Sequence, residues 1–92
     1  MAIILYLERA ENELELAKIV FRISYDNRLK EDLFGLSHNF TFYSAVISHG
    51  YYSIFYTAKA YLMSKGIKTE SPEEHRKTYE EFRKFVFRPI AA

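Results

Sequence analysis

The sequence has no cysteine, no tryptophan, three glycines and two prolines in 92 residues. Without cysteine, neither a disulfide framework nor a thiolate metal site can stabilise the fold, and the absence of thiols fits a cytoplasmic protein. Glycine and proline interrupt helices, so their scarcity, together with long periodic stretches, predicts an all-α protein. We expect residues 1–92 to form one small domain with a thin margin of stability.

Neither strong charge nor a targeting segment marks the sequence. The formal net charge is +1, so no strong field favours nucleic acids or membranes. The start of the sequence lacks a basic region and a cleavage site, so no signal peptide is expected. Residues 42–66 are long enough to cross a bilayer, but His49, Gly50, Lys59 and several hydroxyl side chains argue against a membrane span. We therefore expect a cytoplasmic protein without membrane contact.

The first part of the sequence predicts an amphipathic helix over residues 3–23. Its apolar side chains recur at steps of four and three, the spacing of one helix face: Ile3, Leu7, Ala10, Leu14, Ala17 and Phe21. Acidic residues dominate the early turns and basic residues the late turns, which suits the helix dipole. This face is expected to pack against the rest of the domain.

The central stretch, residues 42–66, differs from the rest of the sequence. No Asp, Glu, Lys or Arg occurs between Leu33 and Ala58, and aromatic side chains fall on nearly every side of a helix. A helix that is apolar all round is surrounded by other elements. We therefore predict a helix over residues 42–65 with neighbours on several sides.

The boundaries of this central helix also have signals. Either Asn39 or Thr41 is expected to cap its start, since both side chains can accept a backbone hydrogen bond. Gly66 predicts a left-handed cap from which Ile67 folds back. Gly50 lies inside the helix and costs about 1 kcal/mol relative to alanine. Either another backbone approaches closely there, or the glycine is only tolerated at an exposed site.

Ser71, Pro72 and Glu74 predict the start of a third long helix. Serine is a favoured N-cap, proline suits the first helical position, and glutamate completes a capping box. The side chains that follow recur at helical spacing: His75, Tyr79, Phe82 and Val86. Pro89 is expected to end the helix and to leave residues 89–92 as a frayed tail.

Residues 24–41, between the first and central helices, match no regular pattern well. Turn-forming residues are followed by Leu29, Leu33 and Leu36 at helical spacing, and Gly35 interrupts that spacing. The segment is either a short helix or a mobile connection.

The predicted fold is an up-and-down antiparallel bundle of three long helices. The aromatic content of the middle helix exceeds what two neighbouring helices would cover. The remaining apolar surface requires either a fourth helix from outside the sequence or a second copy of the chain. Dimerisation is therefore one way to complete the bundle.

Three stretches resemble the HEPN family, the higher eukaryotes and prokaryotes nucleotide-binding domains. These stretches are HGYYSIFYTAKAYL at residues 49–62, KGI at 65–67 with His75 opening the next helix, and YLERA with ELELA in the first helix. The resemblance covers residues 6–86 apart from 24–39. It implies a helical domain.

The resemblance also carries functional expectations. Catalytic HEPN members bear an Arg–x4–6–His motif that cleaves RNA across a dimer interface. That spacing is missing here, since Arg28 and His38 lie too far apart and no histidine follows Arg76. The resemblance therefore implies a non-catalytic interaction or nucleotide-binding module. It would act as a homodimer or with a minimal nucleotidyltransferase in a toxin–antitoxin-like pair. The alternative is a HEPN ribonuclease cleaving RNA across a dimer interface.

Four residues are candidates for ligand binding: His49, His75, Arg76 and Lys77. His49 is either an acid–base or ligand-binding group or a buried histidine bonded to a tyrosine, and no acid lies near it in sequence. The other three could bind the phosphate of a nucleotide or RNA. Their alternative is a solvated helix surface, because glutamates alternate with the basic residues.

The aromatic residues of the central helix are expected to form an interface: Tyr51, Tyr52, Phe55 and Tyr56. Tyrosine suits an interface because it joins apolar area to a polar tip, although the same rings could stack on bases. The three histidines lack the spacing of metal ligands, so neither a metal site nor a cofactor is expected. No residue qualifies as catalytic from its pattern.

Overall fold

The computed structural model describes the backbone of residues 2–91 and the side chains of residues 2–85. It contains four helices, α1 (Ala2–Tyr25), α2 (Asn27–Phe34), α3 (Tyr43–Ser64) and α4 (Glu74–Ala91), and these described residues include no strand. The predicted all-α class is therefore confirmed. No helix within residues 2–91 has the length and hydropathy that crossing a membrane requires.

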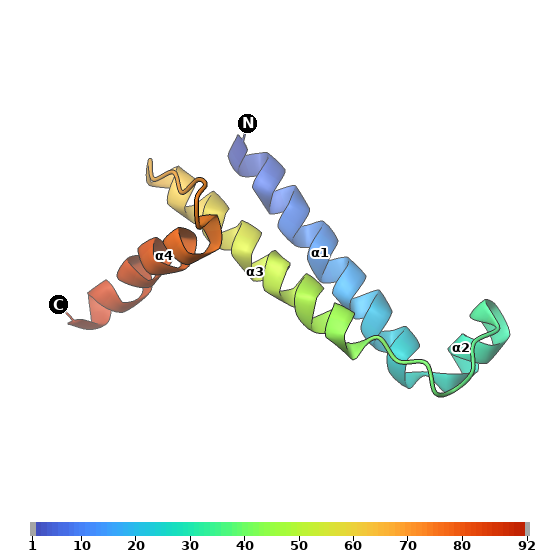
Figure 1. Ribbon diagram of the computed structural model, residues 1–92. Helices are drawn as coiled ribbons and strands as arrows, with labels where there is room; N and C mark the ends of the chain where they lie inside the picture. Colours follow the sequence, from blue (N-terminus) through green and yellow to red (C-terminus); the bar gives the residue numbers. More distant parts are fainter. Residues whose placement is uncertain (1, 92) are drawn as a thin grey trace.

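Helices α1 and α3 lie side by side and antiparallel, and α4 leaves this pair from the side of α3 that faces away from α1 (Figure 1). Within the described residues α4 packs against α3 but not against α1. The prediction that the central helix has neighbours on several sides thus agrees with its position between α1 and α4. The predicted three-helix bundle is present only as the α1–α3 pair, because the α3–α4 connection places α4 too far from α1 to touch it.

The α1–α3 contact is built on small side chains. The buried residues of α1 are seven positions apart and all small: Ala10, Ala17 and Ser24. Ser53 on α3 donates a hydrogen bond through Oγ to the backbone oxygen of Ala10 at 2.9 Å, so the two backbones approach closely. The larger members of the predicted α1 face, Leu7, Leu14 and Phe21, stay exposed beside this contact.

Ser24 joins the end of α1 to the start of α3. Its hydroxyl donates to the backbone oxygen of Val20 at 2.8 Å and accepts from the backbone N–H of Phe42 at 2.8 Å. Phe42 is the N-cap residue of α3 and makes no side-chain cap bond, so the prediction of Asn39 or Thr41 as the cap was wrong. A polar group from α1 anchors this end instead.

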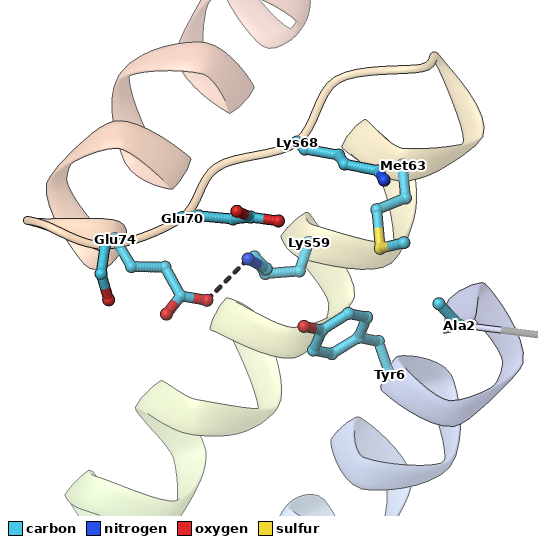
Figure 2. A pocket seen from close by; sticks show the side chains of 8 residues that line it. Ala2, Tyr6, Lys59, Met63, Lys68, Glu70 and Glu74 are labelled. Atoms are coloured by element: carbon cyan, nitrogen blue, oxygen red, sulfur yellow. Dashed lines mark hydrogen bonds and ion pairs between the residues drawn. The ribbon is translucent and has the colours of Figure 1, made fainter.

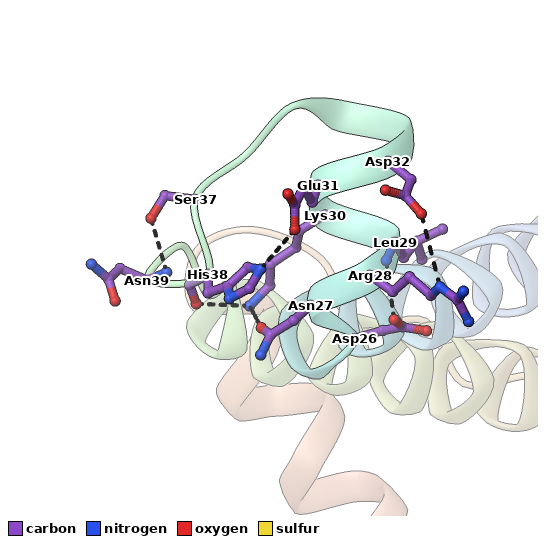
Figure 3. Close-up of polar contacts among 10 residues, drawn as sticks. All are labelled: Asp26, Asn27, Arg28, Leu29, Lys30, Glu31, Asp32, Ser37, His38 and Asn39. Carbon is purple, nitrogen blue, oxygen red and sulfur yellow. Dashed lines mark hydrogen bonds and ion pairs between the residues drawn. The ribbon is translucent and has the colours of Figure 1, made fainter.

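The segment between α1 and α3 contains the short helix α2. The Asp26 side chain caps it by accepting from the backbone N–H of Leu29 at 3.0 Å, and Gly35 ends it with a left-handed φ of 62°. Gly35 therefore follows the helix and does not interrupt it. Lys30 is buried and donates to Asn27 and to the backbone oxygen of His38, which fastens the following loop to α2 (Figure 3).

The end of α3 confirms the predicted left-handed cap. Gly66 has a φ of 77°, and its N–H donates to the oxygen of Met63 at 3.0 Å. The N–H of Ile67 donates to the oxygen of Leu62 at 2.9 Å. These two bonds form a Schellman motif and satisfy carbonyls that the helix end would otherwise leave free.

The start of α4 was predicted two residues too early. Glu73 has a φ of 58°, outside the helical region, so the helix cannot extend back to Pro72 and Ser71 does not cap it. The carbonyl of Glu73 accepts from the N–H of Lys77 at 3.0 Å. The predicted end was also wrong, because α4 passes Pro89 and continues to Ala91. A proline this close to a helix end removes only one hydrogen bond of the ladder. Of the predicted frayed tail, Ala92 lies outside the described residues.

Candidate functional site

An exposed apolar face runs along one flank of the α1–α3 pair. On α3 its residues are spaced by four and seven positions: Tyr43, Ile47 and Ile54. On α1 they are seven positions apart: Leu7, Leu14 and Phe21. The rings of Phe21 and Tyr43 meet at 6.2 Å, which joins the two stripes into one surface. We call these six residues the α1–α3 apolar face.

The α3 half of this face is strongly exposed and uncharged. Ile47 and Ile54 expose 72% and 69% of their surface, although isoleucine is usually buried. Residues 34–57 contain no Asp, Glu, Lys or Arg, so no charged head covers these side chains from within α3. A contiguous exposed apolar surface of this kind is typical of a binding surface in a monomeric protein chain.

The overall dimensions show a chain that is more open than a compact domain of its length. The radius of gyration is 17.0 Å, whereas about 12 Å is expected for a compact domain of this length. The accessible surface is 6892 Å², whereas a folded monomer of 10.9 kDa exposes about 5,600 Å². The surplus of about 1,300 Å² exceeds the roughly 800 Å² that each partner buries in a standard protein interface. The chain alone therefore leaves enough surface to accommodate a partner.

The structure brings His75 together with the predicted interface aromatics. The His75 ring stacks on Phe55 with centroids 4.0 Å apart and an interplanar angle of 10°, and its Nδ1 lies 2.8 Å from the hydroxyl of Tyr51. Tyr52 meets the same ring edge-on. Because these contacts join the start of α4 to α3, His75 works here as a packing residue between the two helices.

The four predicted interface aromatics have different surroundings. Phe55 is only 7% exposed and lies in the core, so its contacts are made inside the chain. Tyr56 stacks on Tyr6 of α1 with centroids 5.9 Å apart, and Arg9 lies over both rings. Tyr51 and Tyr52 surround His75 and remain exposed. The α1–α3 apolar face contains none of the four. Helical spacing alone could not have predicted this, because it does not tell which flank of α3 is covered by α4.

His49 pairs with an acid that its own sequence neighbourhood does not contain. Its Nδ1 lies 2.6 Å from Oε2 of Glu13 on α1, and both side chains are partly buried. The pair crosses from α3 to α1, 36 positions apart in sequence. Local spacing could not have revealed this partner. Within the described residues no three His, Cys, Asp or Glu side chains are grouped as metal ligands.

Arg76 and Lys77 are engaged by groups of their own chain. Arg76 donates to Glu73 at 2.7 Å and to Glu80 at 2.9 Å. The hydrogen bonds to Glu73 and Glu80 raise the pKa of Arg76, and the bond from Arg76 lowers the pKa of Glu73. Lys77 donates to the backbone oxygen of Glu70 at 3.3 Å. A phosphate at this position would have to displace these carboxylates from Arg76.

A cavity of about 520 Å³ opens where the α3–α4 connection passes the start of α1 (Figure 2). Lys59, at 5% exposure, lies in its wall and donates to Glu74 at 2.6 Å and to the backbone oxygen of Thr69. Two lysines and two glutamates line the cavity, so it favours neither sign of charge. Lys59 thus holds the connection against α3, a role that the sequence did not indicate because its partners lie beyond the helix end.

Searches for similarity against protein-family models, curated proteins and solved structures give no match to this chain.

Proposed function

We propose that the chain is a non-catalytic, HEPN-like helical interaction module that works as a homodimer or with a small nucleotidyltransferase, in the manner of a toxin–antitoxin pair. The observation that carries the proposal is the α1–α3 apolar face. Its large side chains are turned to solvent while the adjoining contact buries small ones. Covering this face would complete a helical bundle that the chain leaves unfinished.

The candidate polar residues already make contacts within the chain, and this favours an interaction module over a nucleotide-binding one. His49 is paired with Glu13, His75 stacks on Phe55 of α3, and Arg76 is held by two glutamates. Nucleotide binding would need donors whose bonds are free to turn to phosphate. An uncharged apolar face needs only a complementary apolar surface.

Light scattering of the eluting peak in size exclusion, over a concentration series, tests the proposal. The wild-type chain is expected to elute as a dimer, and Ile54→Glu as a monomer, because the substitution buries a charge in the interface. Leu33→Glu is the matched control, since Leu33 is equally exposed at 70% but lies on α2 outside the α1–α3 apolar face. Circular dichroism should show that both variants keep their helices.

If the chain works with a nucleotidyltransferase and not as a homodimer, the same measurement gives a different result. A wild-type monomer that forms a one-to-one complex with a nucleotidyltransferase encoded beside it, and loses that complex on Ile54→Glu, would support the heteromeric arrangement. A chain that stays monomeric at high concentration, alone and with that protein, would overturn the proposal.

The His49–Glu13 pair supplies a reason to test the ribonuclease alternative. A carboxylate that holds one nitrogen of a histidine can orient the ring for proton transfer. Cleavage of RNA that disappears in His49→Ala but persists in His75→Ala would support it. Equal cleavage by both variants would indicate a contaminating nuclease.

A further inference from the structure

Gly50 lies at the centre of the α3 stripe of the α1–α3 apolar face. It follows Ile47 by three positions and precedes Ile54 by four, so all three side-chain positions share one side of the helix. A Cβ atom at Gly50 would meet no other atom within 4 Å. No contact within the described chain therefore requires glycine here.

A glycine without an internal reason is unfavourable inside a helix. Its backbone loses more freedom on folding than that of any other residue, and alanine at the same place would strengthen the helix. What glycine offers in return is a missing side chain, through which another backbone can approach. With Ile47 and Ile54 standing on either side, Gly50 forms the low point of a saddle into which a crossing helix fits.

The chemistry of this saddle suits a second copy of the same chain. A two-fold axis sets the same surface of two subunits against itself, so any charge near the axis would face its own kind. Residues 34–57 carry no formal charge from Asp, Glu, Lys or Arg, so the part of α3 around Gly50 meets no such repulsion. The shape is also self-complementary, because the isoleucines of one copy can pack beside the glycine of the other.

We propose that two copies of the chain cross α3 over α3 at Gly50, around a two-fold axis, with Ile47 and Ile54 of each copy packed beside the glycine of the other. The inference rests on the homodimer form of the proposed function and names its point of closest contact. The chain as a whole exposes about 1,300 Å² more than a compact monomer of its size, more than the roughly 800 Å² that each partner buries in a standard interface. Leu14 and Tyr43, both exposed, would add to the contact around Gly50.

Cysteine cross-linking tests the contact directly, because the chain has no cysteine of its own. Gly50→Cys is expected to give a disulfide-linked dimer under mild oxidation, since Cα atoms joined by a disulfide are about 4.4–6.8 Å apart. Ser48→Cys is the matched control. Ser48 is exposed on α3 two positions away, on the opposite side of the helix, and is expected to stay mostly monomeric on non-reducing gels.

Substitutions that add bulk at Gly50 provide a second test, because they should stabilise the monomer but weaken the dimer. Gly50→Ala should raise the folding constant of the dilute monomer by up to about fivefold through helix propensity. The same change should raise the dimer dissociation constant at least about tenfold, and Gly50→Leu should abolish the dimer. Ser48→Leu should leave the dimer intact.

The outcomes separate this inference from the proposed function. A wild-type dimer that withstands Gly50→Leu, or that cross-links no better through Gly50→Cys than through Ser48→Cys, overturns the crossing at Gly50 and leaves the homodimer in place. A wild-type chain that is monomeric at every concentration overturns both. Gly50→Ala keeps the test decisive if Gly50→Leu fails to fold.

Discussion

Two surfaces of the α1–α3 pair invert the usual distribution of side chains. The buried contact uses Ala10, Ala17 and Ser24, whereas the flank beside it exposes Leu14, Ile47 and other large residues. Burial of a large apolar side chain stabilises a protein by about 1.5–3 kcal/mol, so a chain that folded only for itself would be expected to bury the large ones. The small contact residues bring the two backbones close and leave both stripes aligned on one flank. The difference supports the proposal that the large residues serve a contact outside the chain.

The largest difference in stability between a core substitution and a substitution on the exposed face is expected at Phe55 and Ile54, which are neighbours in sequence. Phe55→Ala is expected to cost about 3–5 kcal/mol, because it empties the contact between α3 and α4 that Phe55 makes with His75. Ile54→Ala should change the stability of the dilute monomer by less than about 0.5 kcal/mol. Urea unfolding followed by circular dichroism measures both. Similar losses for the two variants would contradict the assignment of core and exposed face.

The small-residue contact predicts the next largest effect. Ala17→Leu adds bulk where α1 meets α3 and should destabilise the chain by about 1–3 kcal/mol through overpacking. Leu14→Ala is the control, because it removes an exposed side chain and should cost the dilute monomer little while weakening the dimer. An Ala17→Leu chain of unchanged midpoint would show that the two helices are farther apart than the Ser53–Ala10 hydrogen bond implies.

The sequence predicted the features that depend on interactions between residues close in sequence. Helix existence and the Gly66 cap depend on residues within one or two turns, and the structure confirms them. The predicted packing face of α1 was only partly right, because Ala10 and Ala17 are buried while Leu7, Leu14 and Phe21 stay exposed. The cap of α3 was missed because Ser24, on another helix, binds the Phe42 N–H. The His49–Glu13 pair was missed for the same reason.

The arrangement of the helices was predicted less well than the helices themselves. Periodicity showed that α3 is apolar on several sides, but it could not show that α4 covers the side of Phe55 while Ile47 and Ile54 stay open. That choice depends on the connection after Gly66, where Lys59 holds Thr69 and Glu74. A contact between a helix and a distant loop leaves no periodic pattern in a sequence.

Lys59 therefore offers a sharper test of how α4 is placed. Lys59→Met keeps the length of the side chain but removes the ammonium group, leaving Glu74 and the Thr69 carbonyl without their donor. We expect a loss of about 1–2 kcal/mol, less than for a fully buried pair because Glu74 is 34% exposed. Hydrogen exchange should rise in the α3–α4 connection and stay unchanged in α1. Lys65→Met, at the exposed end of α3, is the control. Uniform exchange changes would contradict the local role.

The smallest effect is expected at the exposed counterpart of this pair, Arg76 with Glu73. The hydrogen bond and the charge of Arg76 lower the pKa of Glu73 below its ordinary value in the folded chain. A carboxyl with a lowered folded pKa contributes stability that is complete above its unfolded pKa, and that is lost as the pH falls through the folded one. The melting temperature of the wild-type chain should therefore exceed that of Glu73→Gln slightly at pH 7, and the difference should vanish in acid. Glu11→Gln, on α1, controls for the loss of one negative charge. A difference that grows below pH 4.5 would contradict the ion pair, because protonation can only remove the attraction between Glu73 and Arg76.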